Sequence, residues 1–317
     1  MPYRLRLSLF PCAQRYTLAA PGEWSSCNPS IAKDGDGFRV IVRTLNYRLK
    51  ENGKWLGHPP GGARSANWLF HLDRDLRTLG VDRVVDQDVV AGDARAKNGL
   101  EDGRLFYWRG DWWLVASAAQ FRNDTNYSTV CICRLDGDNR IVSPHFIESP
   151  LGMEWEKNWM PVIDGDGLKL IYRISPLQIV APGDDWQPDL RSLGESRPGI
   201  QDWSGSSQLI EYRDGWLCVV HKRVLEKKRV YYQHAFVELS RDFKILRVSR
   251  PWYFDAPTVE FCAGLCLAGD SAILSYGHMD REARLLKLPL SIVENLLTDC
   301  WRSRLALWRA YFRGRKN

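Results

Sequence analysis

The 317-residue sequence contains no run of about 18–20 apolar residues, the length that a membrane-spanning helix needs. Its first residues, Met1-Pro2-Tyr3-Arg4, lead into apolar stretches that arginine and proline interrupt, so the apolar core of a signal peptide is missing too. These two absences predict a protein of the cytoplasm.

Cys-x-x-Cys pairs are also absent, although the sequence has eight cysteines. The segment Cys131-Ile-Cys133 has no histidine beside it. Zinc sites need several cysteine or histidine ligands at short spacing, so we expect no metal, and nothing implies an organic cofactor. Most cysteines stand in apolar runs, which favours buried thiols in a reducing compartment; the even number leaves disulfides as the alternative.

Acidic residues are missing after Asp299, where six basic residues follow: Arg302, Arg304, Arg309, Arg313, Arg315 and Lys316. The net charge of +6 equals this terminal excess, and residues 1–299 balance 38 basic against 38 acidic side chains. A balanced body argues against nucleic acid as the main ligand, because phosphate backbones attract a basic surface.

The terminal segment also has a helical pattern. Large apolar side chains recur at helical spacing: Leu297, Trp301, Leu305, Trp308 and Phe312. We therefore predict a basic amphipathic helix over residues 291–317. We expect it either to pack on the outer wall of the preceding domain, or to contact a partner or the inner face of a membrane.

Residues 1–290 contain no long amphipathic helix, which disfavours a parallel α/β fold. Instead, a tight turn followed by an apolar strand occurs five times. The turns are Asp34–Gly37, Arg109–Asp111, Asp164–Gly167, Arg213–Gly215 and Ala268–Asp270. Glycine and aspartate supply the positive φ of hairpin turns, and the β-branched and aromatic residues that follow favour strands.

The spacing of these turns indicates the architecture. Successive Gly-to-Gly separations are 73, 57, 48 and 54 residues, and a four-stranded propeller blade takes about 40–50 residues plus loops. We therefore predict that residues 1–290 form an all-β, five-bladed β-propeller that carries the catalytic site. An irregular β-sandwich with frequent hairpins is the alternative.

Polar residues occur at equivalent positions in every repeat. They stand either before the first strand of the hairpin or after its second strand. They are Asn28–Ser30, Arg43–Tyr47, Glu101–Arg104, Glu156–Trp159, Tyr172–Pro176, Ser204–Ser207, His221–Arg223 and Tyr276–Asp280. Equivalent strand ends of a propeller meet around one axis. The pattern therefore predicts a shared polar funnel where the blades converge.

The chain resembles glycoside hydrolase family 130, the five-bladed propellers that comprise β-mannoside phosphorylases and related β-mannosidases. The resemblance spans most of residues 25–297. It rests on an ordered set of landmarks: Asn28-Pro29, Arg43, Glu101-Asp102-x-Arg104, Lys157, Tyr172–Pro176 and Tyr276-Gly277-x-x-Asp280. It implies an enzyme that cleaves or forms a β-mannoside-like bond with inversion, by phosphorolysis or hydrolysis.

The resemblance also implies residue roles. Asp102 is expected to be the general acid, acting through a hydroxyl of the bound mannose, with Glu101 beside it and Arg104 orienting it. The sugar is expected to contact Asn28, Arg43, Asn46, Tyr276 and Asp280. The phosphate or nucleophile site is expected to comprise Lys157, Arg173, Tyr172, Arg122 and His221. Glu260 stands where a second sugar-facing carboxylate fits, or where it pairs with a basic neighbour.

The sequence leaves two candidates for the nucleophile, phosphate and water. Phosphate, the one expected co-substrate, needs cationic partners, which arginine supplies bidentately. Water needs a carboxylate base instead, for which Glu154, Glu156 and Glu260 are candidates.

Two further functions are alternatives. One is a glycosyltransferase that uses a sugar phosphate or nucleotide sugar, which the basic terminus would suit at a membrane face. The other is a glycan-binding propeller without catalysis. The expected partners are oligosaccharides or sugar phosphates, and a homo-oligomer is an open alternative.

Overall fold

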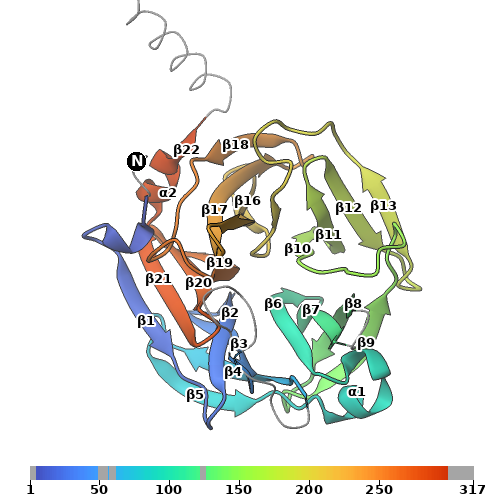
Figure 1. Ribbon diagram of the computed structural model, residues 1–317. Helices are drawn as coiled ribbons and strands as arrows, with labels where there is room; N and C mark the ends of the chain where they lie inside the picture. The colour runs from blue at the N-terminus through green and yellow to red at the C-terminus, as the bar shows by residue number, and fades with distance from the viewer. Residues whose placement is uncertain (1–4, 49–55, 57–61, 122–125, 299–317) are drawn as a thin grey trace, which may run out of the picture.

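The computed structural model describes residues 5–48, 56, 62–121 and 126–298. Five antiparallel sheets stand radially around one axis, and the chain passes through them in order (Figure 1). The predicted five-bladed β-propeller is therefore confirmed, and the β-sandwich alternative is wrong.

Each blade is one sheet with its first strands nearest the axis. Blade 1 contains β2 (Ser25–Asp34), β3 (Gly37–Leu45), β4 (Ser65–Leu72) and β5 (Thr78–Arg83). Blade 2 contains β6 (Leu100–Trp108), β7 (Asp111–Phe121), β8 (Asn126–Leu135) and β9 (Ile141–Ile147). Blade 3 contains β10 (Met160–Asp164), β11 (Gly167–Ile174), β12 (Leu177–Pro182) and β13 (Pro188–Ser192).

The last two blades are less regular. Blade 4 contains β14 (Ser204–Gly205), β15 (Ile210–Tyr212), β16 (Gly215–Glu226), β17 (Arg229–Ser240), β18 (Ile245–Ser249) and β22 (Leu297–Thr298). Blade 5 contains β19 (Glu260–Ala268), β20 (Ser271–His278), β21 (Glu282–Pro289) and β1 (Gln14–Leu18). The short helices are η1 (Leu7–Leu9), α1 (Gln87–Gly92), η2 (Ala94–Ala96) and α2 (Leu290–Leu296).

Both ends of the chain close the ring. Strand β1 pairs antiparallel with β21, so the outermost strand of blade 5 comes from the N-terminal segment. Asp255 reinforces this closure, because its carboxylate accepts hydrogen bonds from Arg15 on β1 at 2.8 Å and from Arg284 on β21 at 2.6 Å. Closure pairs the strands that would otherwise be free edges at the point where the ring begins and ends.

The five predicted turns all join the innermost strand of a blade to the next strand. Each contains a residue in the left-handed region: Gly35, Arg109, Gly165, Arg213 and Gly269 have φ of 55°, 51°, 59°, 53° and 55°. These turns therefore lie at one end of the blades. The polar segments lie at the opposite end of the same strands.

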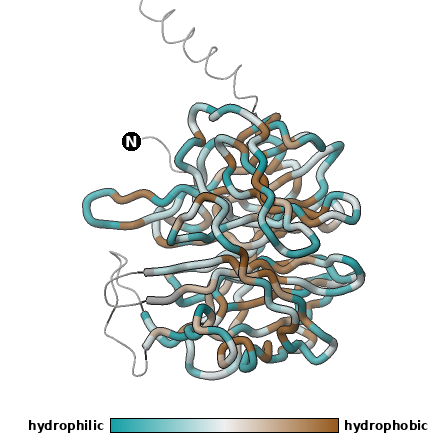
Figure 2. The backbone as a smooth tube through the Cα atoms, turned by 90° about the vertical axis from the view of Figure 1, so that its right-hand side faces the viewer, coloured by the Kyte–Doolittle hydropathy of each residue, from teal (hydrophilic) through white to brown (hydrophobic). Residues whose placement is uncertain are grey.

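Hydrophobic residues fill the space between blades. The five core clusters correspond to the five interfaces between neighbouring blades. Strand β16 shows why: Trp216 and Cys218 pack toward blade 3, whereas Leu217 and Val219 pack toward blade 5. This alternation is the two-residue period of a strand that is buried on both faces. Hydrophilic segments lie mainly in the connecting loops (Figure 2).

The segment after residue 289 differs from the predicted helix over 291–317. Residues Leu290–Leu296 form α2, and Leu297–Thr298 then pair with β18 at the edge of blade 4. Leu297 is buried between blades 4 and 5, with Val293 beside it. Residues 299–317, which include the other four members of the apolar stripe, lie outside the described residues.

Seven cysteines fall within the described residues. All seven are free thiols, and all except Cys12 are buried. No helix in the described ranges is both long and apolar enough to cross a membrane.

Candidate active site

Irregular backbone brings the polar segments of the inner strands together. The pairing of β2 with β3 shifts between Cys27 and Ser30, and that of β6 with β7 shifts between Glu101 and Arg104. Inside these bulges Asn28 and Asp102 adopt φ of 43° and 50°. A bulge re-aims side chains, and left-handed non-glycine residues tend to cluster at functional sites. Strand β2 contacts both β6 of blade 2 and β19 of blade 5, so the innermost strands of these three blades are neighbours.

Arg43 is the centre of this site. Its guanidinium is buried at the end of β3 and contacts Glu101 at 2.7 Å and Asp102 at 3.0 Å. It also donates hydrogen bonds to Ser65 Oγ at 2.9 Å and Tyr47 Oη at 3.1 Å. All three of its nitrogens therefore have protein partners. Arg43 therefore clamps two carboxylates, and its predicted contact with sugar hydroxyls stays a prediction.

The two clamped carboxyls differ in their electrostatics. Burial would raise the pKa of Asp102, but Arg43, Arg104 and the hydrogen bonds from Asn28 and Arg43 together lower it below its ordinary value. Burial raises the pKa of Glu101, which Arg43 opposes only in part. Asp102 is therefore held as a carboxylate. Its Oδ1 accepts from Asn28 at 2.8 Å as well as from Arg43.

Arg104 fixes the backbone of the segment that carries Asp102. It is 1% exposed, and burial lowers its pKa to about 10. It donates to the backbone carbonyl of Asp102 at 2.7 Å, to Ser206 O at 2.9 Å and to Asn158 Oδ1 at 3.1 Å. Arg104 thus fixes the backbone of Asp102 and links blades 2, 3 and 4, while its charge acts on the carboxylate without a direct bond.

Asp280 joins the cluster from blade 5. It follows β20 in a left-handed conformation, with φ of 50°. Burial raises the pKa of its carboxyl to about 6; Arg43 opposes this shift and Asp102 adds to it. Arg43 thus contacts Glu101 and Asp102 directly and interacts electrostatically with Asp280.

A cavity of about 360 Å³ adjoins this cluster and contains three residues of the predicted nucleophile site, Lys157, Tyr172 and Arg173. Trp155 and Trp203 also line it. Lys157 interacts electrostatically with Asp102 and Glu101, and Asn158, which also lines the cavity, accepts a hydrogen bond from Arg104. The cavity and the carboxyl cluster are therefore neighbours. Burial lowers the pKa of Lys157, the two carboxylates raise it, and Arg223 and Arg104 lower it further.

Tyr172 and Glu156 form the wall of this cavity. The Tyr172 hydroxyl donates to Glu156 Oε1 at 2.7 Å, and Ser149 and Trp159 donate to the same carboxylate. Burial and this bond raise the pKa of Tyr172 to about 12. Glu156 is therefore fully occupied and is not free to act as a base.

His221 is at the site but is not a cation. It is buried, and its Nδ1 lies 2.9 Å from Ser206 Oγ. Burial, Arg104 and Lys157 lower its pKa to about 3. A neutral His221 can donate or accept a hydrogen bond at the predicted nucleophile site, and its membership of that site stays a prediction. Arg122, the remaining predicted member of that site, lies outside the described residues.

Two residues of the site received no role in the sequence analysis, although one of them, Arg223, lies in the polar segment His221–Arg223. Arg223 and Tyr232 stand opposite each other on the β16–β17 hairpin. Burial raises the pKa of Tyr232 to about 12, Asp280 adds to the shift, and Arg223 opposes it. Arg223 lies two residues after His221 on the same strand face. This period of two was the signal that could have identified it.

Three residues that were predicted to contact the sugar have hydrogen-bond partners within the protein. The side-chain amide of Asn46 donates a hydrogen bond to Gly62 O and accepts one from Arg64 N. It thus ties the two ends of the loop between β3 and β4 together. Tyr276 is fully buried; it stacks on Phe254 at 3.8 Å and donates to Asp255. Both side chains thus have hydrogen-bond partners within the protein, and their contact with a sugar stays a prediction.

Glu260 is the third. Its buried carboxylate accepts the backbone N–H groups of Phe254, Asp255 and Ala256 at 2.9, 2.9 and 3.0 Å. It therefore holds the loop before β19 and does not face a sugar. Glu154, the other candidate base, is exposed and does not line the cavity.

One group of potential metal ligands occurs among the described residues. Donor atoms of Asp255, Glu260 and His278 lie within 4.8 Å of one another. All four carboxylate oxygens already accept hydrogen bonds, from Arg15, Arg284, Tyr276 and three backbone N–H groups. The cluster is thus explained by the closure of blade 5.

Gly277 is predicted to be irreplaceable behind Asn28. A Cβ at this position would lie 1.9 Å from Asn28 Oδ1 and 2.7 Å from its backbone nitrogen. Gly277→Ala should therefore displace Asn28 from Asp102 and cost about 1–3 kcal/mol in unfolding free energy, as overpacking does. Urea denaturation measures the loss. Gly80→Ala, whose Cβ would meet nothing closer than 3.8 Å, is the matched control; equal losses would contradict the prediction.

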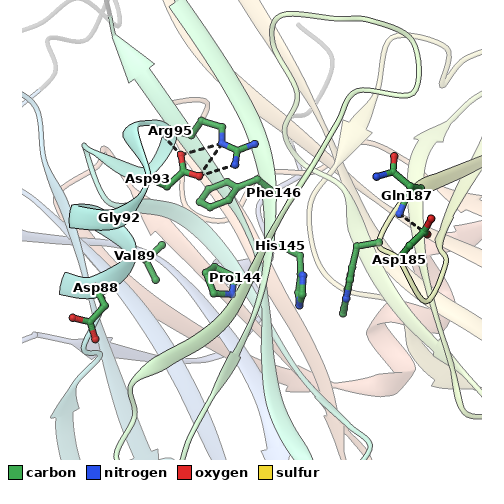
Figure 3. Close-up of a pocket in the computed structure, with 11 residues that line it drawn as sticks. Asp88, Val89, Gly92, Asp93, Arg95, Pro144, His145, Phe146, Asp185 and Gln187 are labelled. Atoms are coloured by element: carbon green, nitrogen blue, oxygen red, sulfur yellow. Dashed lines mark hydrogen bonds and ion pairs between the residues drawn. The ribbon is translucent and has the colours of Figure 1, made fainter.

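A larger cavity lies away from the axis. It has a volume of about 470 Å³ and lies between α1, β9 and the turn that joins β12 to β13 (Figure 3). His145 and Trp186 stack within it at 3.9 Å, so these rings cover each other. None of the predicted site residues lines it.

Comparisons with known proteins support the fold. No family model and no curated protein matches the sequence. A β-1,2-mannobiose phosphorylase from Listeria innocua has a similar structure, with a TM-score of 0.57, 13% identity, and coverage of 91% of this chain and 94% of that one. A mannose phosphorylase from Leishmania mexicana, solved with a phosphate ion, has a TM-score of 0.53, 12% identity and 84% coverage of both chains.

A third similar structure belongs to the GH130 family, whose hydrolases target β-1,2-mannosidic linkages in Candida mannan; it has a TM-score of 0.58, 13% identity and 84% coverage of both chains. At these identities the likeness shows a shared propeller fold.

Proposed function

We propose that this protein is a carbohydrate-active enzyme that cleaves or forms a β-mannoside-like bond at the axial site by inverting phosphorolysis. One observation carries the proposal: Arg43 contacts the carboxylates of Glu101 and Asp102 next to a cavity that Lys157 and Arg173 line. Glycosyl transfer needs a carboxylic acid for the leaving oxygen and a nucleophile on the opposite ring face. The axial cluster supplies the first requirement, and the cavity has room for the second.

Phosphate is favoured over water by the side chains that line the cavity. The carboxylates considered as bases for water are satisfied by other groups or lie elsewhere, as shown above for Glu156, Glu260 and Glu154. Lys157 and Arg173 instead offer two positive charges to an anion. The fold is shared with phosphorylases, one of them solved with a phosphate ion.

The chemistry follows from these charges. Arg43 keeps Asp102 ionised, and the carboxylate stabilises the positive charge that develops on the sugar ring in the transition state. A phosphate oxygen attacks the anomeric carbon, the glycosidic bond breaks, and the leaving oxygen takes a proton from a carboxyl of the axial cluster. The products are a sugar 1-phosphate and the released sugar.

The test runs the phosphorolysis in the reverse direction, as glycoside synthesis. The protein is incubated with mannose 1-phosphate and a panel of acceptor sugars, and phosphate release is measured. Release is the expected result. Turnover of a nucleotide sugar without phosphate release would support a transferase instead, and hydrolysis of mannosides without added phosphate would contradict phosphorolysis.

Lys157→Met is expected to raise the KM for phosphate by about 10-fold or more, because a charge-assisted contact to the anion is lost. The KM for the sugar should change little. Lys244→Met is the control, because Lys244 pairs with Asp242 on an exposed turn far along the chain. An unchanged KM for phosphate in Lys157→Met would remove Lys157 from the anion site.

A further inference from the structure

Lys157 lines the cavity together with Arg173, but it lies in the loop between β9 and β10 and not in a strand of a blade. A lysine has a long and flexible stem, so it holds an anion at a fixed point only where the surrounding backbone is itself held. The two neighbours of Lys157 in the sequence supply this support, because both are anchored through their side chains.

Glu156 anchors the segment on one side. It is 5% exposed, and its carboxylate accepts hydrogen bonds from Ser149 Oγ at 2.5 Å, Tyr172 Oη at 2.7 Å and Trp159 Nε1 at 3.1 Å. Its backbone N–H donates to Ser128 O at 2.8 Å, and Ser128 Oγ donates to Glu156 O at 2.8 Å. A buried carboxylate with three donors is held in one position, because a displacement would leave its charge unsatisfied away from water.

Asn158 anchors the segment on the other side. Its backbone adopts a left-handed φ of 64°, which asparagine tolerates better than most residues do. Its Oδ1 accepts a hydrogen bond from Arg104 at 3.1 Å, and the same guanidinium donates to the carbonyl of Asp102 at 2.7 Å. One buried arginine therefore connects the segment that carries Lys157 with the segment that carries Asp102.

The side chains between these anchors differ in what they offer to an anion. The Lys157 ammonium lies over the Trp155 ring, 5.3 Å from its centroid, and both residues line the cavity. Tyr172 lines the same cavity, but a tyrosine hydroxyl has a single proton, and this one is donated to Glu156. That proton is not available to a phosphate oxygen, whereas the protons of the ammonium are.

We infer that Tyr172 and Asn158 are positioning residues, which hold residues 156–158 from both sides and thereby fix Lys157 against the phosphate. The inference rests on the proposed function. It departs from the sequence prediction that placed Tyr172 in the phosphate site itself, because Tyr172 acts on the anion through Glu156 and Lys157. Since Arg104 bonds to both segments, the position of Lys157 relative to Asp102 is fixed as well.

A double-mutant cycle separates positioning from direct contact. Tyr172→Phe, which removes only the hydroxyl, and Asn158→Ala are each made in the wild type and in Lys157→Met. Phosphorolysis of β-linked mannobiose is then measured at varied phosphate concentrations. In the wild type, each change is expected to raise the KM for phosphate by about 5- to 10-fold, because a misplaced group binds less well. In Lys157→Met, neither should raise it further.

The division between kinetic constants distinguishes positioning from a general loss of structure. In Tyr172→Phe, kcat and the KM for mannobiose should stay within about 2-fold of the wild type, since the lost interaction concerns the anion. Tyr107→Phe is the matched control, because Tyr107 is 55% exposed near the end of β6 that faces away from the site, and it should behave as wild type. Urea denaturation verifies that each variant is folded.

Two results would overturn the inference and leave the proposed function standing. One is an unchanged KM for phosphate in Tyr172→Phe. The other is an equal rise in the wild type and in Lys157→Met, which would show that Tyr172 contacts the phosphate directly. A wild-type protein whose turnover of mannobiose does not depend on phosphate would instead contradict the proposed function itself.

Discussion

Asp102→Asn is expected to lower the rate of mannoside phosphorolysis by about 10³-fold, within the range seen when a residue that stabilises transition-state charge or transfers a proton is lost. Asparagine keeps the size of the side chain and its hydrogen bonds, but it removes the negative charge. Arg43 then has one carboxylate partner in place of two, and its field is less compensated at the position of the sugar ring.

Steady-state kinetics on β-linked mannobiose in the presence of phosphate measure this effect. Asp111→Asn is the matched control, because Asp111 forms a half-exposed pair with Arg134 on the next strand of the same blade. The expected split is a large fall in kcat with a small change in the KM for phosphate. A rate close to that of the wild type would exclude Asp102 from the mechanism.

Arg43→Met is expected to be the most destabilising single change at the site, by about 3–5 kcal/mol in unfolding free energy. The reason is that Glu101 and Asp102 would be left as buried carboxylates without their cation. Ser65 and Tyr47 would also lose a hydrogen-bond donor. Methionine retains much of the volume, so lost packing contributes little.

The loss of unfolding free energy in Arg43→Met should be larger at neutral pH than at acid pH. Arg43 opposes the rise that burial causes in the pKa of both carboxyls, so its removal raises both folded pKa values, that of Glu101 from a value already above its ordinary one. A group with a raised folded pKa prefers to be protonated, and the deficit therefore shrinks as pH falls through that range and is largest at neutral pH.

Urea denaturation at pH 5 and pH 8 tests both statements. Arg191→Met is the control, because the exposed Arg191–Asp189 pair should contribute at most about 1 kcal/mol. A deficit for Arg43→Met no larger than that of the control, or one that grows toward acid pH, would show that the clamp does not stabilise the fold.

The sequence alone determined the architecture. The five turns are local, because the positive φ of Gly35 or Gly165 and the apolar strand after it are encoded within about ten consecutive residues. The equivalent positions of the polar segments, at the strand ends opposite these turns, could be recognised from the same local pattern. Antiparallel pairing places every strand end opposite a fixed residue of its neighbour, as Arg43 lies opposite Cys27 on β2.

Only the tertiary structure decided which of the polar residues are available for chemistry. Asp102 and Glu260 are both carboxylates on innermost strands, and nothing in their local sequences separates them. Glu260 is satisfied by the backbone of residues 254–256, whereas Asp102 faces a guanidinium from another blade. Hydrogen-bond partners and burial depend on segments that are distant in sequence, so the role of a polar residue is settled when the blades close into a ring.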